Sequence, residues 1–117
     1  MQAEALNEQA AAPTQDVIDL LNRILTRAGL TNKTLTDYAT KEELRQAIRD
    51  QRRLELTFEG HRWFDLKRWY KNDATFNMFN YLTTKFPGRV VDAHNYVMPI
   101  SQDEMDRNPK MTQNSGY

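Results

Sequence analysis

The chain has 117 residues and a mass of 13.8 kDa, which is enough for one domain. Sixteen basic side chains balance sixteen acidic ones, and this zero net charge argues against a dedicated nucleic-acid binder, whose domains usually have a pI above about 9. The absence of cysteine excludes disulfide scaffolds, thiolate zinc sites and thiol nucleophiles. No run of about 18 apolar residues exists, so no segment is predicted to span a membrane.

Two helices are predicted on either side of a proline near the start of the chain. Residues 1–12 are typical of the last turns of an amphipathic helix, and Pro13 ends it because proline lacks a backbone N–H. A second helix is predicted over residues 14–28, since its apolar residues recur on one face with a period of about 3.6 residues. Gly29 is the expected cap at the C-terminus of this helix.

A capping box predicts the start of a longer helix. In Thr40-Lys41-Glu42-Glu43 the threonine hydroxyl can accept from an orphan amide while the second glutamate reaches back. We expect this helix to end at Gly60 and a helical pattern to resume over residues 61–69, with Trp63 and Phe64 in the core. The sequence leaves open whether these are two helices or one kinked helix.

The pattern becomes irregular after residue 69. Pro87-Gly88 marks a turn, and residues 101–105 can form a helical turn with Ser101 as its cap. The fold class predicted for the whole chain is therefore all-α, as a single segment over residues 1–117. Residues 1–69 are expected to be helical, and residues 70–117 to be irregular with short helical turns.

The densest polar cluster comprises Glu55, Glu59, Arg62 and Asp65. A metalloprotease site needs two histidines four positions apart with a glutamate between them, and the two histidines of this chain, His61 and His94, are far apart in sequence. Arginines and carboxylates at this density favour an ion-pair network, which can resemble an active site. We therefore predict no catalytic residue, metal ligand or cofactor, and assign the cluster a structural role.

Aromatic residues in the irregular region could stack on a sugar ring. A pyranose has an apolar C–H face, and an aromatic platform with nearby amides such as Asn77 or Asn80 suits it. The candidates for ligand binding are Tyr70, Tyr81 and Tyr96, with Phe79 beside them. Packing in the hydrophobic core explains the presence of each of these aromatic residues equally well. Stacking on nucleic acid is the alternative for the aromatic and basic residues 61–70, but acidic residues in the same stretch disfavour it.

Residues 52–69, RRLELTFEGHRWFDLKRW, closely resemble the signature of the SusD/RagB family of outer-membrane glycan-binding lipoproteins of Bacteroidetes-type bacteria. Three further blocks agree with the family in order, at residues 2–8, 22–30 and 98–117. The resemblance implies a mostly helical fold with tetratricopeptide-like helix pairs. Because full members are several times longer, it also implies that this chain is the C-terminal segment of such a protein.

The resemblance further implies a function. The intact protein would be surface-exposed, anchored in the outer membrane through a lipidated cysteine upstream of this chain. It would bind an oligosaccharide, deliver it to a SusC-like TonB-dependent transporter, and have no enzymatic activity. The alternative is a helical scaffold that docks on the transporter without touching sugar. Under either reading, we expect Glu55, Glu59, Arg62 and Asp65 to lock a helix junction at Gly60.

Overall fold

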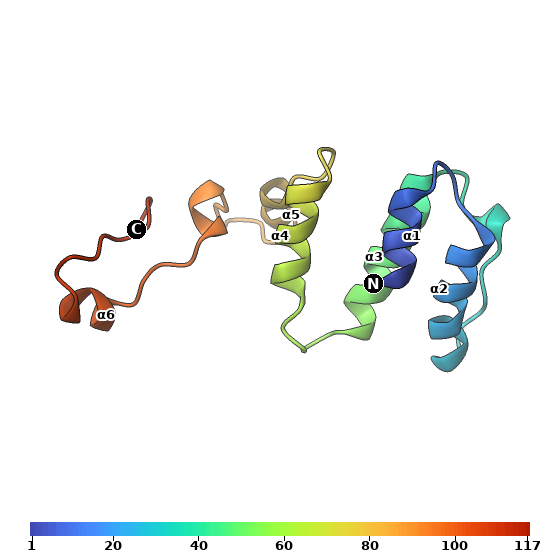
Figure 1. Cartoon of the computed structure of the whole chain (residues 1–117), viewed down its shortest axis with the longest axis horizontal. Helices are drawn as coiled ribbons and strands as arrows, with labels where there is room; N and C mark the ends of the chain where they lie inside the picture. The colour runs from blue at the N-terminus through green and yellow to red at the C-terminus, as the bar shows by residue number, and fades with distance from the viewer. The chain divides into compact units, whose positions relative to one another are not determined.

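The computed structural model describes residues 1–117, and all of its regular elements are helical, which confirms the all-α prediction. The chain forms two compact units, Met1–His61 and Arg62–Tyr117, which are described separately. Figure 1 shows the six α-helices, which are accompanied by two short 3₁₀ helices. Their bounds are α1 Gln2–Gln9, α2 Gln15–Arg27, η1 Leu35–Asp37, α3 Lys41–Glu55, α4 Arg62–Asn72, α5 Met78–Lys85, η2 Ala93–Tyr96 and α6 Gln102–Arg107.

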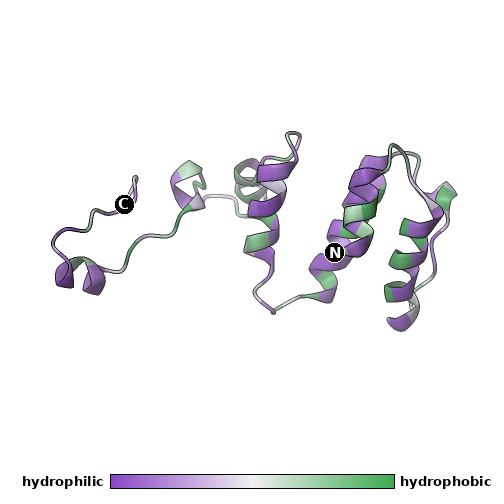
Figure 2. Ribbon diagram, in the orientation of Figure 1, coloured by the Kyte–Doolittle hydropathy of each residue, from purple (hydrophilic) through white to green (hydrophobic).

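The first unit is built from α1, α2 and α3, with α1 packed against both of the others. The apolar stripe predicted on the second helix is buried, and Figure 2 shows hydrophobic residues recurring along α2. Because these residues repeat with the helical period, one face of α2 can be covered continuously. The buried core consists of Val17, Ile18, Leu21, Leu25, Leu44 and Ile48.

The predicted cap at Gly29 is confirmed. Gly29 has a φ of 70°, its N–H donates to the Thr26 carbonyl at 3.1 Å, and the Leu30 N–H donates to the Leu25 carbonyl at 2.9 Å. This pair of bonds is the Schellman motif, which satisfies carbonyls that the end of a helix would otherwise leave without partners.

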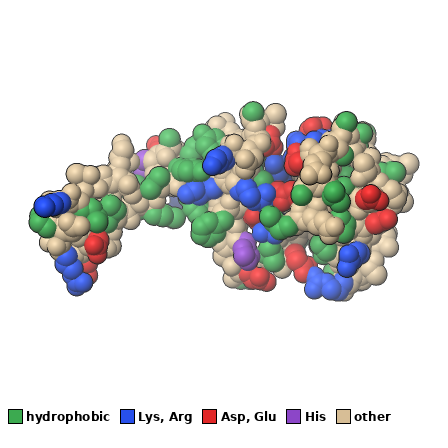
Figure 3. Space-filling model, viewed as in Figure 1, with side chains coloured by type: hydrophobic (Ala, Val, Ile, Leu, Met, Phe, Trp, Pro, Cys, Tyr) green, Lys and Arg blue, Asp and Glu red, His purple; other side chains and the backbone are tan.

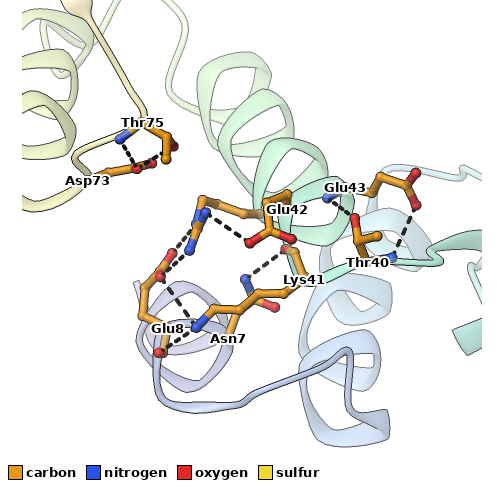
Figure 4. Close-up of polar contacts among 9 residues, drawn as sticks. Asn7, Glu8, Thr40, Lys41, Glu42, Glu43, Asp73 and Thr75 are labelled. Atoms are coloured by element: carbon orange, nitrogen blue, oxygen red, sulfur yellow. Dashed lines mark hydrogen bonds and ion pairs between the residues drawn. The ribbon is translucent and has the colours of Figure 1, made fainter.

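The predicted capping box at Thr40 is also confirmed. The Glu43 N–H donates to Thr40 Oγ1 at 3.2 Å, and the Thr40 N–H donates to Glu43 Oε2 at 3.3 Å, as Figure 4 shows. The expected end of this helix at Gly60 is wrong, because α3 ends at Glu55. The Thr57 N–H donates to the Leu54 carbonyl at 3.4 Å, its hydroxyl lies within hydrogen-bond distance of the Arg53 and Leu54 carbonyls at 2.7 and 2.9 Å, and the chain then leaves the helix at Phe58, whose φ is positive.

The two helices around residue 60 are therefore separate. Phe58 and Gly60 have positive φ values of 69° and 75°, which no α-helix contains, and α4 begins only at Arg62. The sequence had left this choice open.

The second unit is centred on α4 and α5. Asn77 caps α5, since its Oδ1 accepts from the N–H groups of Phe79 and Asn80, both at 3.0 Å. The expectation that Phe64 lies in the core is wrong, because this side chain is 69% exposed. It lies on the side of α4 opposite the buried helix face, while Trp63 is partly buried against the core. The buried core of this unit consists of Leu66, Trp69, Met78 and Leu82.

The last residues of the chain fold back on residues 94–100. The Gln113 side chain accepts from the Ile100 N–H at 2.8 Å and donates to the Ile100 carbonyl at 2.9 Å. Asn114 Nδ2 donates to the Met98 carbonyl at 2.7 Å, and Tyr117 meets the His94 ring edge-to-face at 5.0 Å. Side chains thus satisfy the backbone groups of a segment that forms no strand.

The helical turn predicted over residues 101–105 is present as α6. The predicted cap by the Ser101 side chain is wrong, because the hydroxyl forms no capping hydrogen bond. The Ser101 carbonyl instead accepts from the N–H groups of Glu104 and Met105, both at 3.1 Å, so the backbone alone closes this turn.

Candidate sugar-binding surface

The three candidate tyrosines all lie in the second unit, and the structure brings two of them together. Tyr70 is in the last turn of α4 and Tyr96 ends η2, and their ring centroids are 6.1 Å apart. Phe79 of α5 meets Tyr70 edge-to-face at 5.1 Å. We refer to Tyr70, Phe79 and Tyr96 as the Tyr70 cluster. It offers the aromatic surface that a sugar needs, since Tyr70 is 39% exposed.

Tyr81 lies apart from this cluster and packs inside the unit. Its ring is 5.9 Å from Phe76, and its hydroxyl accepts a hydrogen bond from Arg62 Nη2 at 2.7 Å. The Arg62 guanidinium lies 5.2 Å from the Tyr81 centroid and 5.1 Å from that of Trp69. The hydroxyl of Tyr81 thus has a partner within the protein, which makes Tyr81 a weaker candidate than Tyr70 and Tyr96.

Lys67 belongs to the same surface and was missed by the sequence reasoning. Its ammonium nitrogen lies 4.2 Å above the centroid of the Tyr96 ring, a cation–π contact. The spacing of three residues between Lys67 and Tyr70 could have indicated a shared helix face. The contact with Tyr96, however, depends on the path of the chain after α5, which carries no periodic signal.

The two candidate amides differ in what they can offer a ligand. The side-chain oxygen of Asn77 accepts two backbone hydrogen bonds as the cap of α5. Asn80 follows Phe79 directly in α5 and is exposed. Of the two, Asn80 therefore has the more available side chain for a sugar hydroxyl.

The four residues of the predicted polar cluster each contact a side chain outside the set. Glu55 forms an ion pair with Arg27, and Glu59 Oε2 lies 3.9 Å from His61 Nε2. Asp65 is buried, and its Oδ1 lies 3.1 Å from Arg68 Nη2. The partner described above for Arg62 is Tyr81. The role of the four residues as a lock on the helix junction stays a proposal.

Three further features of the structure concern metal ions, cavities and membrane spans. No group of three or more His, Asp and Glu residues is placed to hold a metal ion. The first unit has a hollow of about 120 Å³, with Ala3, Leu21, Ile24 and Ile48 among its lining residues. Small-molecule pockets usually measure about 300–1,000 Å³, so this hollow is too small for an oligosaccharide. None of the helices is both long and apolar enough to cross a bilayer.

The fold defines a class of protein: an all-helical chain of packed helices with a partly exposed aromatic cluster. The model of the SusD family, SusD_RagB, matches residues 1–117, and the chain belongs to this family. The resemblance to the SusD/RagB family is thereby confirmed.

Two curated relatives come from Formosa agariphila. SusD-like protein P2 is 34% identical over 122 residues, which cover 98% of this chain and 23% of that protein. SusD-like protein P38 is 34% identical over 123 residues, which cover 100% of this chain and 22% of that protein. The chain thus spans less than a quarter of the length of these relatives. No solved structure matches the chain.

Proposed function

We propose that this chain is part of a glycan-binding protein of an outer-membrane polysaccharide uptake system, without enzymatic activity. The observation that carries the proposal is the match to the SusD family over all residues of the chain. In this proposal the intact protein is surface-exposed and held by a lipid anchor upstream of this chain. It passes oligosaccharide to a SusC-like TonB-dependent transporter.

Within the chain, we propose that the sugar contacts the Tyr70 cluster. Tyr70 and Tyr96 are close enough for one sugar residue to touch both rings, and Tyr70 is partly exposed. Burial of the C–H face of a pyranose against aromatic carbon removes apolar surface from water, and neighbouring amides can orient its hydroxyls. Tyr81 stays a weaker candidate because its hydroxyl is already bonded to Arg62.

Calorimetric titration of the 117-residue chain with a panel of plant and host oligosaccharides tests this proposal. We expect saturable binding that is lost in the double variant Tyr70→Ala/Tyr96→Ala. Phe86→Ala is a matched control, because Phe86 is an exposed aromatic residue of the same unit outside the cluster. If the chain is helical by circular dichroism but binds no oligosaccharide of the panel, the cluster is not a sugar site.

A second candidate function, a scaffold that docks on the transporter, is favoured by one observation. The end of α3 and the turn after it expose large apolar side chains, with Leu54 of the helix at 64% and Phe58 of the turn at 102%. Apolar side chains of this kind can act as anchors in a protein interface. Titration with peptides of the transporter's outer loops tests it: binding that Phe58→Ser abolishes, with no response to sugars, would favour the scaffold.

A further inference from the structure

The Tyr70 cluster lies within a stretch that has an excess of basic side chains, in a chain that is neutral overall. Residues 62–100 contain six Lys and Arg side chains and three Asp and Glu side chains. Figure 3 shows basic side chains beside hydrophobic ones on the part of the molecule that contains α4 and α5. The stretch that carries the aromatic surface therefore has an excess of positive charge, which an uncharged ligand would not require.

The three carboxylates of this stretch are occupied by other groups. Asp65 is buried beside Arg68, and Asp73 accepts from the N–H and hydroxyl of Thr75 at 3.0 and 2.6 Å, as Figure 4 shows. Asp92 Oδ1 accepts from the His94 N–H at 3.0 Å and lies 2.5 Å from the His94 ring nitrogen. Each of these carboxylates thus has a partner near it in sequence. None of these contacts involves a lysine of α4.

Lys67 and Lys71 lie four residues apart on α4, on the face that also carries Tyr70. Neither lysine forms an ion pair with a carboxylate of the chain. Lys67 is directed onto the Tyr96 ring, which places a positive charge within the cluster. An ammonium group has three donors and the ring occupies only one side of it, so donors remain for a ligand.

We propose that the Tyr70 cluster selects acidic sugars, with Lys67 and Lys71 binding a uronate carboxylate or a sulfate ester while the sugar ring lies against Tyr70 and Tyr96. This inference rests on the proposed function and names the class of ligand. Both anions present oxygens that accept charge-assisted hydrogen bonds from an ammonium group. The aromatic rings supply the ring contact and the lysines discriminate between acidic and neutral sugars.

A nucleic acid is the other ligand that combines anionic groups with stacking surfaces. The zero net charge of the chain and the small number of unpaired lysines on α4 disfavour it, because nucleic-acid affinity comes largely from neutralising several phosphates. Family membership favours the sugar. Binding of an oligonucleotide is therefore included as an outcome of the test.

The test compares acidic ligands with neutral counterparts that have the same sugar backbone. The 117-residue chain is titrated with tri-galacturonate and with its neutral methyl ester, and in a second arm with a sulfated carrageenan tetrasaccharide and its desulfated counterpart. We expect the acid of at least one pair to bind about tenfold more tightly than its neutral partner, and this preference to weaken as salt is raised. The two arms distinguish carboxylate from sulfate.

Variants assign the preference to the lysines. Lys67→Gln should reduce the affinity for the acid about tenfold and leave that for the ester unchanged, whereas Lys67→Arg should retain the preference. Lys110→Gln is the matched control, since Lys110 is an exposed lysine of the same unit outside α4. Circular dichroism verifies that each variant keeps its helices.

The outcomes separate this inference from the proposed function. Equal binding of acid and neutral partner in both arms, lost in Tyr70→Ala/Tyr96→Ala, would overturn the charge selection and retain the sugar site. Absence of binding to all four ligands and to the wider panel would overturn both. Equally tight binding of a single-stranded oligonucleotide, unaffected by the tyrosine substitutions, would show a general anion patch and contradict the proposal.

Discussion

Glu8 joins the last turn of α1 to α3 through a bidentate ion pair. Arg45 Nε and Nη2 donate to the two carboxylate oxygens at 2.6 and 2.7 Å, and Lys41 Nζ donates to the Glu8 carbonyl at 2.7 Å (Figure 4). The hydrogen bond with Arg45 is the main cause that lowers the pKa of Glu8 from its ordinary value of 4.5. Folding therefore favours the ionised carboxylate.

This shift predicts a pH-dependent contribution to stability. Because the pKa is lower in the folded state, the contribution is complete above about 4.5 and is lost as the pH falls through the folded-state value. We expect Glu8→Gln to lower the free energy of unfolding at pH 7 by less than about 1 kcal/mol, since the side chain is 43% exposed. Urea unfolding at neutral pH and near pH 2 measures the change.

The control for Glu8 is Glu104→Gln, an exposed carboxylate in the first turn of α6. The difference in the free energy of unfolding between wild type and Glu8→Gln should vanish near pH 2. The control should differ little or not at all from the wild type at either pH. A gap at pH 7 that persists unchanged in acid would mean that the Glu8 carboxylate does not stabilise the fold through its charge.

The proposed lock at the helix junction predicts a larger loss of stability on substitution of Asp65 than on substitution of Glu59. Asp65 is buried beside Arg68, so Asp65→Ala strands a partly buried arginine and should cost about 3 kcal/mol. The Glu59 side chain is 58% exposed, so Glu59→Ala should cost less than about 1 kcal/mol. Chemical denaturation of both variants measures these costs. If Asp65→Ala unfolds as easily as the wild type does, Asp65 has no part in a lock.

Among the helices, α2 and α3 each have a threonine as N-cap residue, but the two threonines differ in their hydrogen bonds. Thr40 accepts a hydrogen bond from the Glu43 N–H at the start of α3, whereas Thr14 precedes α2 without any side-chain capping bond. Thr40→Ala should therefore lower the free energy of unfolding by about 1 kcal/mol, and Thr14→Ala by clearly less. Thermal melts of the two variants provide a matched comparison. Equal destabilisation would show that the hydroxyl bond does not account for the effect.

The fold-back of the C-terminal residues depends on Gln113. Its side chain makes both hydrogen bonds to the backbone of Ile100, in the manner of a neighbouring strand. Gln113→Ala should increase hydrogen exchange of the Ile100 amide several-fold, because its N–H loses its acceptor. Gln102→Ala is the control, since Gln102 bonds only within α6, to Asp106. Unchanged exchange at Ile100 in Gln113→Ala would contradict this role.

Over the whole molecule, local signals predicted helix starts better than helix ends or long-range contacts. The period of α2 and the capping box at Thr40 could be read directly, because each depends on residues within a few positions. The end of α3 was missed because the chain turns at Phe58, which has a positive φ of 69° although it is not a glycine, a conformation that the sequence pattern does not reveal. The contact of Tyr70 with Tyr96 depends on the irregular path between α5 and η2, so sequence could name both residues but could not pair them.

The two units have hydrophobic clusters with no member in common. The sequence predicts a single segment over residues 1–117, which also concerns how the chain divides into units, and this stays a prediction. Leu44 is fully buried in the first cluster, so Leu44→Ala should cost about 2–5 kcal/mol through lost burial and a residual cavity. Leu54→Ala is the control, because this leucine of the same helix is exposed.

Hydrogen exchange decides whether this cost is shared between the clusters. If each cluster stabilises its own helices, Leu44→Ala should accelerate exchange of the amides of α1, α2 and α3 and leave those of α4 and α5 close to the wild-type rates. A uniform acceleration over all five helices would instead show that residues 1–117 unfold as one cooperative unit. The separate behaviour is the one we expect, because the apolar side chains buried around Leu44 all come from the first unit.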